Sequence, residues 1–165
     1  MVKQGIFLGH VISPKGIEVD KAKVDLISNL PPPQIVKEIR SFLGHAWSYE
    51  RFIKDFSKIA RLCNLLAKDV PFDFNDKCQI AFKILKKTLT STPIIQPPNW
   101  GLPFEIMCDA FDYVVGAVLG YRVEKLHHVI YYASKTLNDA QLNYSTIENE
   151  LLAVVFAVDI LLARI

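Results

Sequence analysis

Two acidic side chains stand where a divalent metal ion could be held. Asp109 closes an apolar, alternating segment, and Glu150 lies in the first turns of an apolar segment with helical spacing. Hard ions such as Mg²⁺ prefer oxygen ligands, and two ions about 4 Å apart can activate water and stabilise the leaving oxygen in phosphodiester hydrolysis. Spacing alone leaves a plainer alternative open, with Asp109 as a turn residue and Glu150 as a charge that favours a helix start.

A second candidate site is cationic. Lys54, Lys58 and Arg61 recur at a spacing that places them on one helix face, close in sequence to the aromatic residues Trp47 and Tyr49. Such a face can follow a phosphate backbone and stack on bases. A solvated helix surface is an equal alternative.

Other kinds of site find no support in the sequence. The four histidines lack metal-binding spacing, and no Gly-rich phosphate loop or Ser/His/Asp set is found. The three cysteines, Cys63, Cys78 and Cys108, are scattered along the chain and set among apolar neighbours. This arrangement is a poor disulfide framework and predicts buried structural thiols.

The charge of the chain is uneven although its net value is only +2. Residues 34–68 carry seven Lys/Arg and three Asp/Glu, whereas residues 100–165 carry four and eight. This division suggests contact with a polyanion in the middle and a carboxylate site towards the end, with ordinary surface variation as the alternative.

Composition indicates a packed, intracellular protein. Hydrophobic residues make up 51% and charged residues 22% of the chain. No apolar run reaches the roughly 18–20 residues that a membrane span needs, and no signal peptide is visible. We therefore expect neither secretion nor a membrane partner.

The elements that must position these residues begin with a hairpin. Residues 6–12 and 17–19 are rich in β-branched and apolar side chains and flank a Ser-Pro-Lys-Gly turn. Asp20 can cap a helix over 21–29, which the prolines at 31–33 end.

Helical spacing then continues over residues 35–68, with Gly44 as a stop, and a third helix follows Asp76. Pro and Gly clusters over 91–102 indicate a linker.

Beyond the linker the period of the pattern becomes two. Phe104, Ile106 and Cys108 alternate with Glu105, Met107 and Asp109, and residues 114–121 and 129–133 predict further strands. Gly116 and Gly120 suggest close backbone approach or a bulge.

The last predicted element is a helix that starts with a capping box. Ser145 and Glu148 have the spacing of that motif. We expect the inward face of this helix to be formed by Ile147, Leu151, Val154, Val155, Val158 and Leu162.

Several segments, in this order, are similar to gypsy-type long-terminal-repeat retrotransposon polyproteins at the junction of reverse transcriptase and ribonuclease H. FLGHVIS at 7–13 resembles the primer-gripping hairpin, and VKEIRSFLG at 36–44 with RFIKDFS at 51–57 resembles the thumb helices. The ribonuclease H likeness lies in CDA at 108–110, GAVL at 116–119, YYASKTL at 131–137, and NYS and ELLAVV within 143–155.

The resemblance implies an α+β fold, with a helical thumb-like region followed by a truncated ribonuclease H-like α/β domain of antiparallel strands and then a helix. The expected division is a palm hairpin and thumb at 1–90, a linker at 91–102 and the ribonuclease H-like part at 103–165. It also implies an ancestral reaction, hydrolysis of RNA in RNA–DNA hybrids by a two-metal mechanism.

The implied site residues are few. Asp109 and Glu150 would be catalytic ligands of Mg²⁺, with Mn²⁺ as a substitute. Gly9 and His10 would join the cationic residues in contacting an RNA–DNA hybrid or primer–template, and the rest of the polyprotein would be a further partner.

The chain also departs from the family pattern. It contains no tyrosine-x-aspartate-aspartate polymerase motif, two later acids of the family fall beyond residue 165, and Phe111 stands where a small serine is commoner. We therefore expect no DNA synthesis and weak or no hydrolysis by this chain alone. A non-catalytic nucleic-acid-binding remnant and a non-functional relic remain alternatives.

Overall fold

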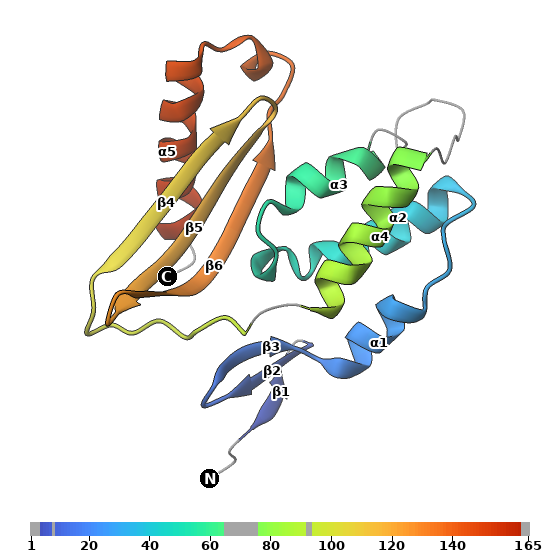
Figure 1. Ribbon diagram of the computed structural model, residues 1–165, viewed down its shortest axis with the longest axis horizontal. Helices are drawn as coiled ribbons and strands as arrows, with labels where there is room; N and C mark the ends of the chain where they lie inside the picture. Colours follow the sequence, from blue (N-terminus) through green and yellow to red (C-terminus); the bar gives the residue numbers. More distant parts are fainter. Residues whose placement is uncertain (1–3, 8, 65–75, 92–93, 163–165) are drawn as a thin grey trace.

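The computed structural model describes residues 4–7, 9–64, 76–91 and 94–162, arranged as a helical half and a sheet half (Figure 1). The helical half comprises, in chain order, β1 (Gly5–Phe7), β2 (His10–Ser13), β3 (Gly16–Val19), α1 (Lys21–Asn29), α2 (Val36–Trp47), η1 (Glu50–Phe52), α3 (Phe56–Asn64) and α4 (Asp76–Thr90). The sheet half comprises β4 (Phe104–Phe111), β5 (Val114–Val123), β6 (Leu126–Thr136), η2 (Gln141–Asn143) and α5 (Thr146–Leu162).

The first sheet is a three-stranded antiparallel meander in the order β1-β2-β3. The predicted hairpin is confirmed, since β2 and β3 pair across the turn at Ser13–Gly16. Its first segment, residues 6–12, is divided into two strands, because Gly9 has a φ of 78° and separates β1 from β2. Left-handed backbone of this kind favours glycine. The cap of α1 is confirmed, since the Ala22 amide donates to Asp20 Oδ1 at 3.1 Å.

Helix α2 runs past its predicted stop. Gly44 lies inside the helix, and Ser48 follows as the C-cap residue. Buried Ile39, Phe42, Leu43 and Ala46 sit at helical spacing. Burial of this stripe continues on both sides of Gly44, so the cost of a helical glycine, about 1 kcal/mol, does not end the helix.

The second sheet has the order β4-β5-β6, with antiparallel pairing throughout. Its strands β5 and β6 extend further than the sequence predicted, and a register shift lies between Leu119 and Gly120. Both glycine expectations are confirmed. A Cβ on Gly120 would lie 2.5 Å from the His128 carbonyl oxygen, and one on Gly116 would lie 3.3 Å from Asp55 Oδ1.

Helix α5 turns a different face to the sheet from the predicted one. Ala153, Phe156 and Ala157 are buried. The expected inward residues are exposed instead, from Ile147 at 81% to Val158 at 42%, and the Leu162 side chain lies outside the described residues. Between Leu151 and Val158 the helix is apolar on every side, so periodicity could not choose a face there. The small alanines allow the closest approach to the strands.

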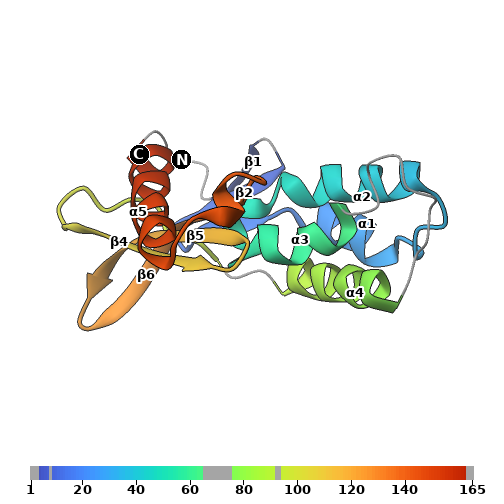
Figure 2. The same ribbon diagram turned by 90° about the horizontal axis from the view of Figure 1, so that it is seen from above.

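Each half has its own hydrophobic core. Phe52, Phe56 and Leu85 are fully buried in the helical half, and Val115 and Leu119 in the sheet half. Figure 2 shows α5 on one side of the sheet, while α3 and η1 contact β6. A bridge between Ile17 and Ile95 holds the segment between the halves against β3, and the Ile95 side chain is part of the core of the helical half. Among the described residues, no helix is long and apolar enough to cross a bilayer.

Candidate functional site

Asp109 is an exposed residue of β4, the edge strand of the second sheet. It pairs with Gly116 of β5, which in turn pairs with Ser134 of β6, so these three residues form one row across the sheet. Ser134 accepts a hydrogen bond from Ser57 of α3. The row therefore faces the helical half.

Glu150 is exposed on α5. That helix packs on the residues that alternate with the Asp109 row, including Ala117 and Ala133. Asp109 and α5 thus lie towards different faces of the sheet.

The capping box that starts α5 is confirmed. Glu148 accepts hydrogen bonds from the Ser145 amide and hydroxyl, both at 2.8 Å. These bonds, the backbone one first, lower the pKa of the Glu148 carboxyl. Glu148 is therefore engaged locally, and Glu150 remains the carboxylate of this turn that is available for other contacts.

The predicted metal site can be tested against this geometry. Asp109 and Glu150 offer oxygen donors of the type that Mg²⁺ prefers. Within the described part of the chain, however, no group of three or more His, Cys, Asp or Glu side chains is arranged to hold a metal ion. The described residues present two separate carboxylates and do not form a metal centre.

A hollow of about 190 Å³ lies between the Asp109 row and the helical half, lined among others by Lys54, Asp55, Asp109 and Tyr132. Burial, and then the negative charge of Asp55, raise the pKa of the Tyr132 phenol. Asp55 adopts a φ of 55°, a left-handed conformation that few residues other than Gly, Asn and Asp accept. The ionisable lining of the hollow comprises one cation, Lys54, with Asp55, Asp109 and Tyr132, and the hollow is too small for a nucleic-acid duplex.

The two predicted hairpin contacts are placed differently. Gly9 lines an open hollow with Lys23, His45 and Ser48. The His10 ring is half-buried and stacks on Phe52, with 5.4 Å between ring centroids. Gly9 is accessible to a ligand, whereas the His10 ring packs inside the helical half.

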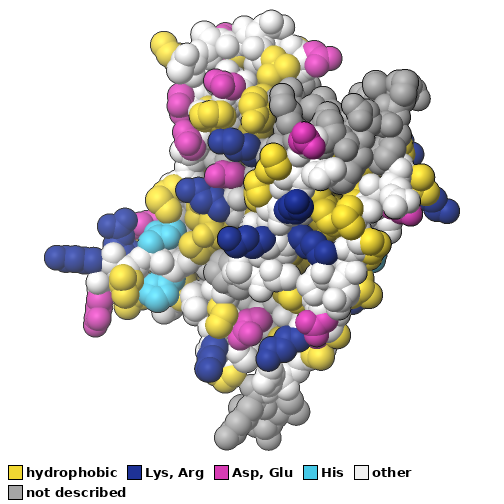
Figure 3. Space-filling model, turned by 45° about the vertical axis from the view of Figure 1, so that its right-hand side comes forward, with side chains coloured by type: hydrophobic (Ala, Val, Ile, Leu, Met, Phe, Trp, Pro, Cys, Tyr) yellow, Lys and Arg dark blue, Asp and Glu magenta, His cyan; other side chains and the backbone are white. Residues whose placement is uncertain are grey.

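The predicted cationic face is only partly assembled. Lys54 is exposed but precedes α3, which begins at Phe56, so it does not share a helix face with Lys58. The Lys58 ammonium lies 3.9 Å from the centroid of the Phe111 ring, an intramolecular cation–π contact. The Arg61 side chain lies outside the described residues. More generally, Lys and Arg side chains gather near the middle of the face in Figure 3.

The predicted aromatic pair is divided. Trp47 is 51% exposed, whereas Tyr49 is 5% exposed. Burial, and then the charge of Asp20, raise the pKa of the Tyr49 phenol. Only Trp47 is therefore available for stacking on a ligand.

Helix α2 carries exposed residues that the sequence reasoning missed. Lys37, Arg40, Gly44 and Trp47 are exposed and follow one another at spacings of three, four and three. Nothing lies within 4 Å of a Cβ placed on Gly44, so the backbone there is open to close approach. The sequence shows this spacing, but the helical pattern was used only to predict which residues of the helix are buried.

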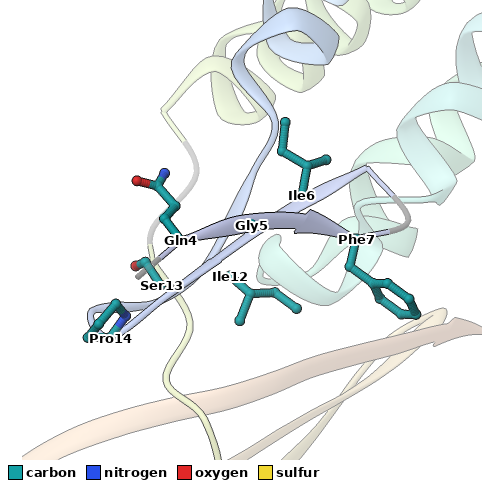
Figure 4. A pocket seen from close by; sticks show the side chains of 7 residues that line it. All are labelled: Gln4, Gly5, Ile6, Phe7, Ile12, Ser13 and Pro14. Carbon is teal, nitrogen blue, oxygen red and sulfur yellow. The ribbon is translucent and has the colours of Figure 1, made fainter. Parts of the chain in front are cut away.

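A hollow of about 460 Å³ lies on the N-terminal hairpin (Figure 4), lined by Gln4, Gly5, Ile6, Phe7, Ile12, Ser13 and Pro14. Figure 4 shows Phe7 and Ile12 on one side of the strands and Ile6 on the other. None of the described residues that line this hollow has an ionisable side chain, so this lining supplies no acid–base group.

Comparison with known proteins gives a consistent assignment. A model of the family described as the RNase H-like domain found in reverse transcriptase matches residues 74–161. The chain is 36% identical to the retrovirus-related Pol polyprotein from transposon opus of Drosophila melanogaster, over 93% of this chain and 16% of the relative. It is 40% identical to that from Drosophila transposon 297, over 94% and 14%. The chain thus spans about a seventh of these relatives.

Solved structures agree in fold across both halves. The foamy viral protease-reverse transcriptase in complex with RNA/DNA hybrid matches with a TM-score of 0.81 and 19% identity, over 94% of this chain and 21% of that one. A second foamy viral structure, in complex with double-stranded DNA, gives 0.82 and 19%, over 96% and 29%. This likeness confirms the predicted α+β fold class. The chain is similar to a segment of retrovirus-related Pol polyproteins of Drosophila transposons, and it belongs to the family of RNase H-like domains found in reverse transcriptase.

Proposed function

We propose that this chain contacts duplex nucleic acid, an RNA–DNA hybrid or a primer–template, through the exposed face of α2. The observation that carries the proposal is the row of Lys37, Arg40, Gly44 and Trp47 on that face. Two cations neutralise phosphates, an open glycine lets the duplex approach the backbone, and an exposed indole offers a stacking surface. Foamy viral relatives in fold were solved with hybrid and with duplex DNA, which supports this class of ligand.

Charge reversal on α2 tests the proposal. Lys37→Glu with Arg40→Glu is expected to lower affinity for a hybrid duplex and to reduce the slope of log affinity against log salt by about 2, because each lost phosphate contact removes roughly one released counterion. Binding is measured by fluorescence anisotropy over a salt series.

The matched control is Lys83→Glu with Lys87→Glu on the exposed side of α4. It makes the same change in net charge and is expected to leave the slope near its original value. Equal losses in both double variants would show that binding responds to net charge and not to α2.

Accessory contacts follow from the same picture. We propose Gly9 and Lys54 as accessible points of contact with the nucleic acid, and the remainder of a retrotransposon polyprotein as the covalent partner of this region. For Lys58 we propose a supporting role, because its ammonium is held over Phe111. His10 remains a prediction from the resemblance, and Arg61 remains a prediction from the helical spacing of the cationic residues.

The second candidate function is hydrolysis of RNA in an RNA–DNA hybrid. It is favoured by the family match together with two exposed carboxylates at the positions of the family motifs, Asp109 and Glu150. We propose these two as part of the acid set, with Mg²⁺ or Mn²⁺ as the cofactor and further acids supplied by other parts of a longer polyprotein. No step is assigned to the isolated chain.

Cleavage of an end-labelled hybrid by the purified chain in Mg²⁺ tests this assignment. The expected rate is at or near background, because the described residues do not assemble a metal centre. Any metal-dependent cleavage is expected to vanish in Asp109→Asn and in Glu150→Gln, and to persist in Asp112→Asn, a neighbouring exposed acid. Robust cleavage that survives Asp109→Asn would place the active site elsewhere.

A further inference from the structure

The two halves meet at a pair of buried hydroxyl groups. Ser57, the second residue of α3, is 4% exposed, and Ser134 of β6 is 7% exposed. The Ser57 amide donates to Ser134 Oγ at 2.8 Å, and the Ser57 hydroxyl donates to the Ser134 carbonyl at 2.9 Å. Ser57 donates both bonds and Ser134 accepts both, and because the two serines are 77 positions apart in the chain the pair joins the halves directly.

Because the two serines are buried, their hydrogen bonds favour one position of α3 on β6. A buried donor or acceptor that loses its partner is penalised far more than an exposed one, since no water replaces the bond. A hydrophobic contact tolerates sliding, whereas these two bonds are satisfied in only one register of α3 on β6. Among the buried side chains of the described residues, Ser57 and Ser134 are the polar ones.

Two neighbouring contacts also depend on this position of α3 on the second sheet. Asp55 Oδ1 lies over Gly116 of the Asp109 row, where any side chain would press against it. The Lys58 ammonium sits on the Phe111 ring at the end of β4. Away from the serine pair, the segment between the halves is joined to β6, where the Gln96 backbone amide donates to the Val129 carbonyl oxygen at 2.8 Å.

We propose that Ser57 and Ser134 form a polar latch that fixes the orientation of the helical half on the sheet half. Its consequence rests on the function proposed above: with the latch closed, the α2 face and the Asp109 row are held in one fixed relative orientation when a nucleic acid binds. Opening the latch frees the halves to turn about the linker without unfolding either core, because each half keeps its own buried cluster.

Hydrogen–deuterium exchange of the full chain, read by mass spectrometry, tests the latch. Ser57→Ala is expected to raise exchange at least about tenfold in peptides at the start of α3 and around Ser134 of β6, by local opening. Peptides from α4 and from the buried part of α5 are expected to keep their protection. Ser134→Ala removes the other bond of the pair, the one that Ser134 Oγ accepts from the Ser57 amide, and should raise exchange in the same peptides. The double variant removes both bonds and should raise exchange at the joint further than either single variant.

Two controls separate a latch from general loss of stability. Ser28→Ala removes an exposed hydroxyl that bonds within α1 and is expected to change nothing at the joint. Ser57→Thr keeps the hydroxyl and is expected to restore most of the protection. A uniform rise in exchange across both halves, or no rise at the joint, would overturn the proposal.

Duplex affinity provides an independent reading. Ser57→Ala leaves the α2 face unaltered, so its salt slope for duplex binding is expected to match that of the unmodified chain. If the α2 variants above fail to change binding while the exchange pattern is as described, the nucleic-acid proposal falls and the latch stands. If the reverse is found, the latch falls alone.

Discussion

Leu85→Ala is expected to lower the free energy of unfolding by about 2–5 kcal/mol, the usual cost of a large-to-small change in a packed core. Leu85 is 0% exposed and lies on α4 in the cluster that also contains Phe42, Phe82 and Leu89. Removing the isopropyl end of its side chain leaves a cavity where α4 packs on its neighbours. Denaturant unfolding, followed by far-ultraviolet circular dichroism, measures the change.

Ile84→Ala is the matched control, because it removes the same number of carbon atoms from the adjacent residue of the same helix. Ile84 is 43% exposed, so its loss is expected to cost well under the Leu85 value. Equal costs for the two variants would show that α4 is not packed in this orientation and that the core of the helical half has been assigned to the wrong side chains.

Local signals in the sequence predicted local structure well. The Asp20 cap, the Ser145 and Glu148 capping box, and the close approach at Gly116 and Gly120 were all predicted and are all present. Each of these features depends on residues within a few positions of one another, or on a glycine that only a crowded backbone requires. The physics of the two caps is therefore contained in short stretches of sequence, whereas the glycine at 116 signals a close approach without showing that its neighbour is Asp55.

Features set by packing between distant segments could not be predicted in the same way. Helix α5 is apolar on every side between Leu151 and Val158. Only its contact with the strands shows that Ala153 and Ala157 face inward. Lys54 fell outside α3 because Asp55 takes a left-handed conformation just before the helix. Neither serine of the latch carries a signal of its own, since the interaction spans 77 positions.

The candidate site shows the same division. Asp109 and Glu150 were selected by residue type and by resemblance, and both are exposed. Their relation in space depends on strand register and on which face α5 covers. The sequence pattern alternates Asp109 with Cys108, but it does not say that the Asp109 side of the sheet would meet the helical half.

Gly120→Ala is expected to lower the free energy of unfolding by about 1–3 kcal/mol, as overpacking of a well-packed site usually does. The register shift beside Leu119 brings β6 so close that a new Cβ would lie 2.5 Å from the His128 carbonyl oxygen and 2.6 Å from His127 Cε1. The carbonyl is part of a hydrogen-bonded strand, so it cannot move without disturbing the pairing of β5 with β6. Thermal and denaturant unfolding of the full chain measure the cost.

Substitutions at two other glycines serve as comparisons for this result. Gly116→Ala meets only the carboxylate of Asp55, at 3.3 Å, which can shift by a small rotation, so its cost is expected to be the smaller. Gly44→Ala meets nothing within 4 Å inside a helix and is expected to stabilise the chain by roughly 0.5–1 kcal/mol, because alanine loses less backbone entropy than glycine. The expected change in the free energy of unfolding therefore runs from a loss at Gly120, through a smaller loss at Gly116, to a gain at Gly44. This order follows from what each added Cβ would touch. A Gly120→Ala variant as stable as the unmodified chain would mean that the strands do not approach as described, and the register of β6, with the position of Ser134 in the latch, would have to be redrawn.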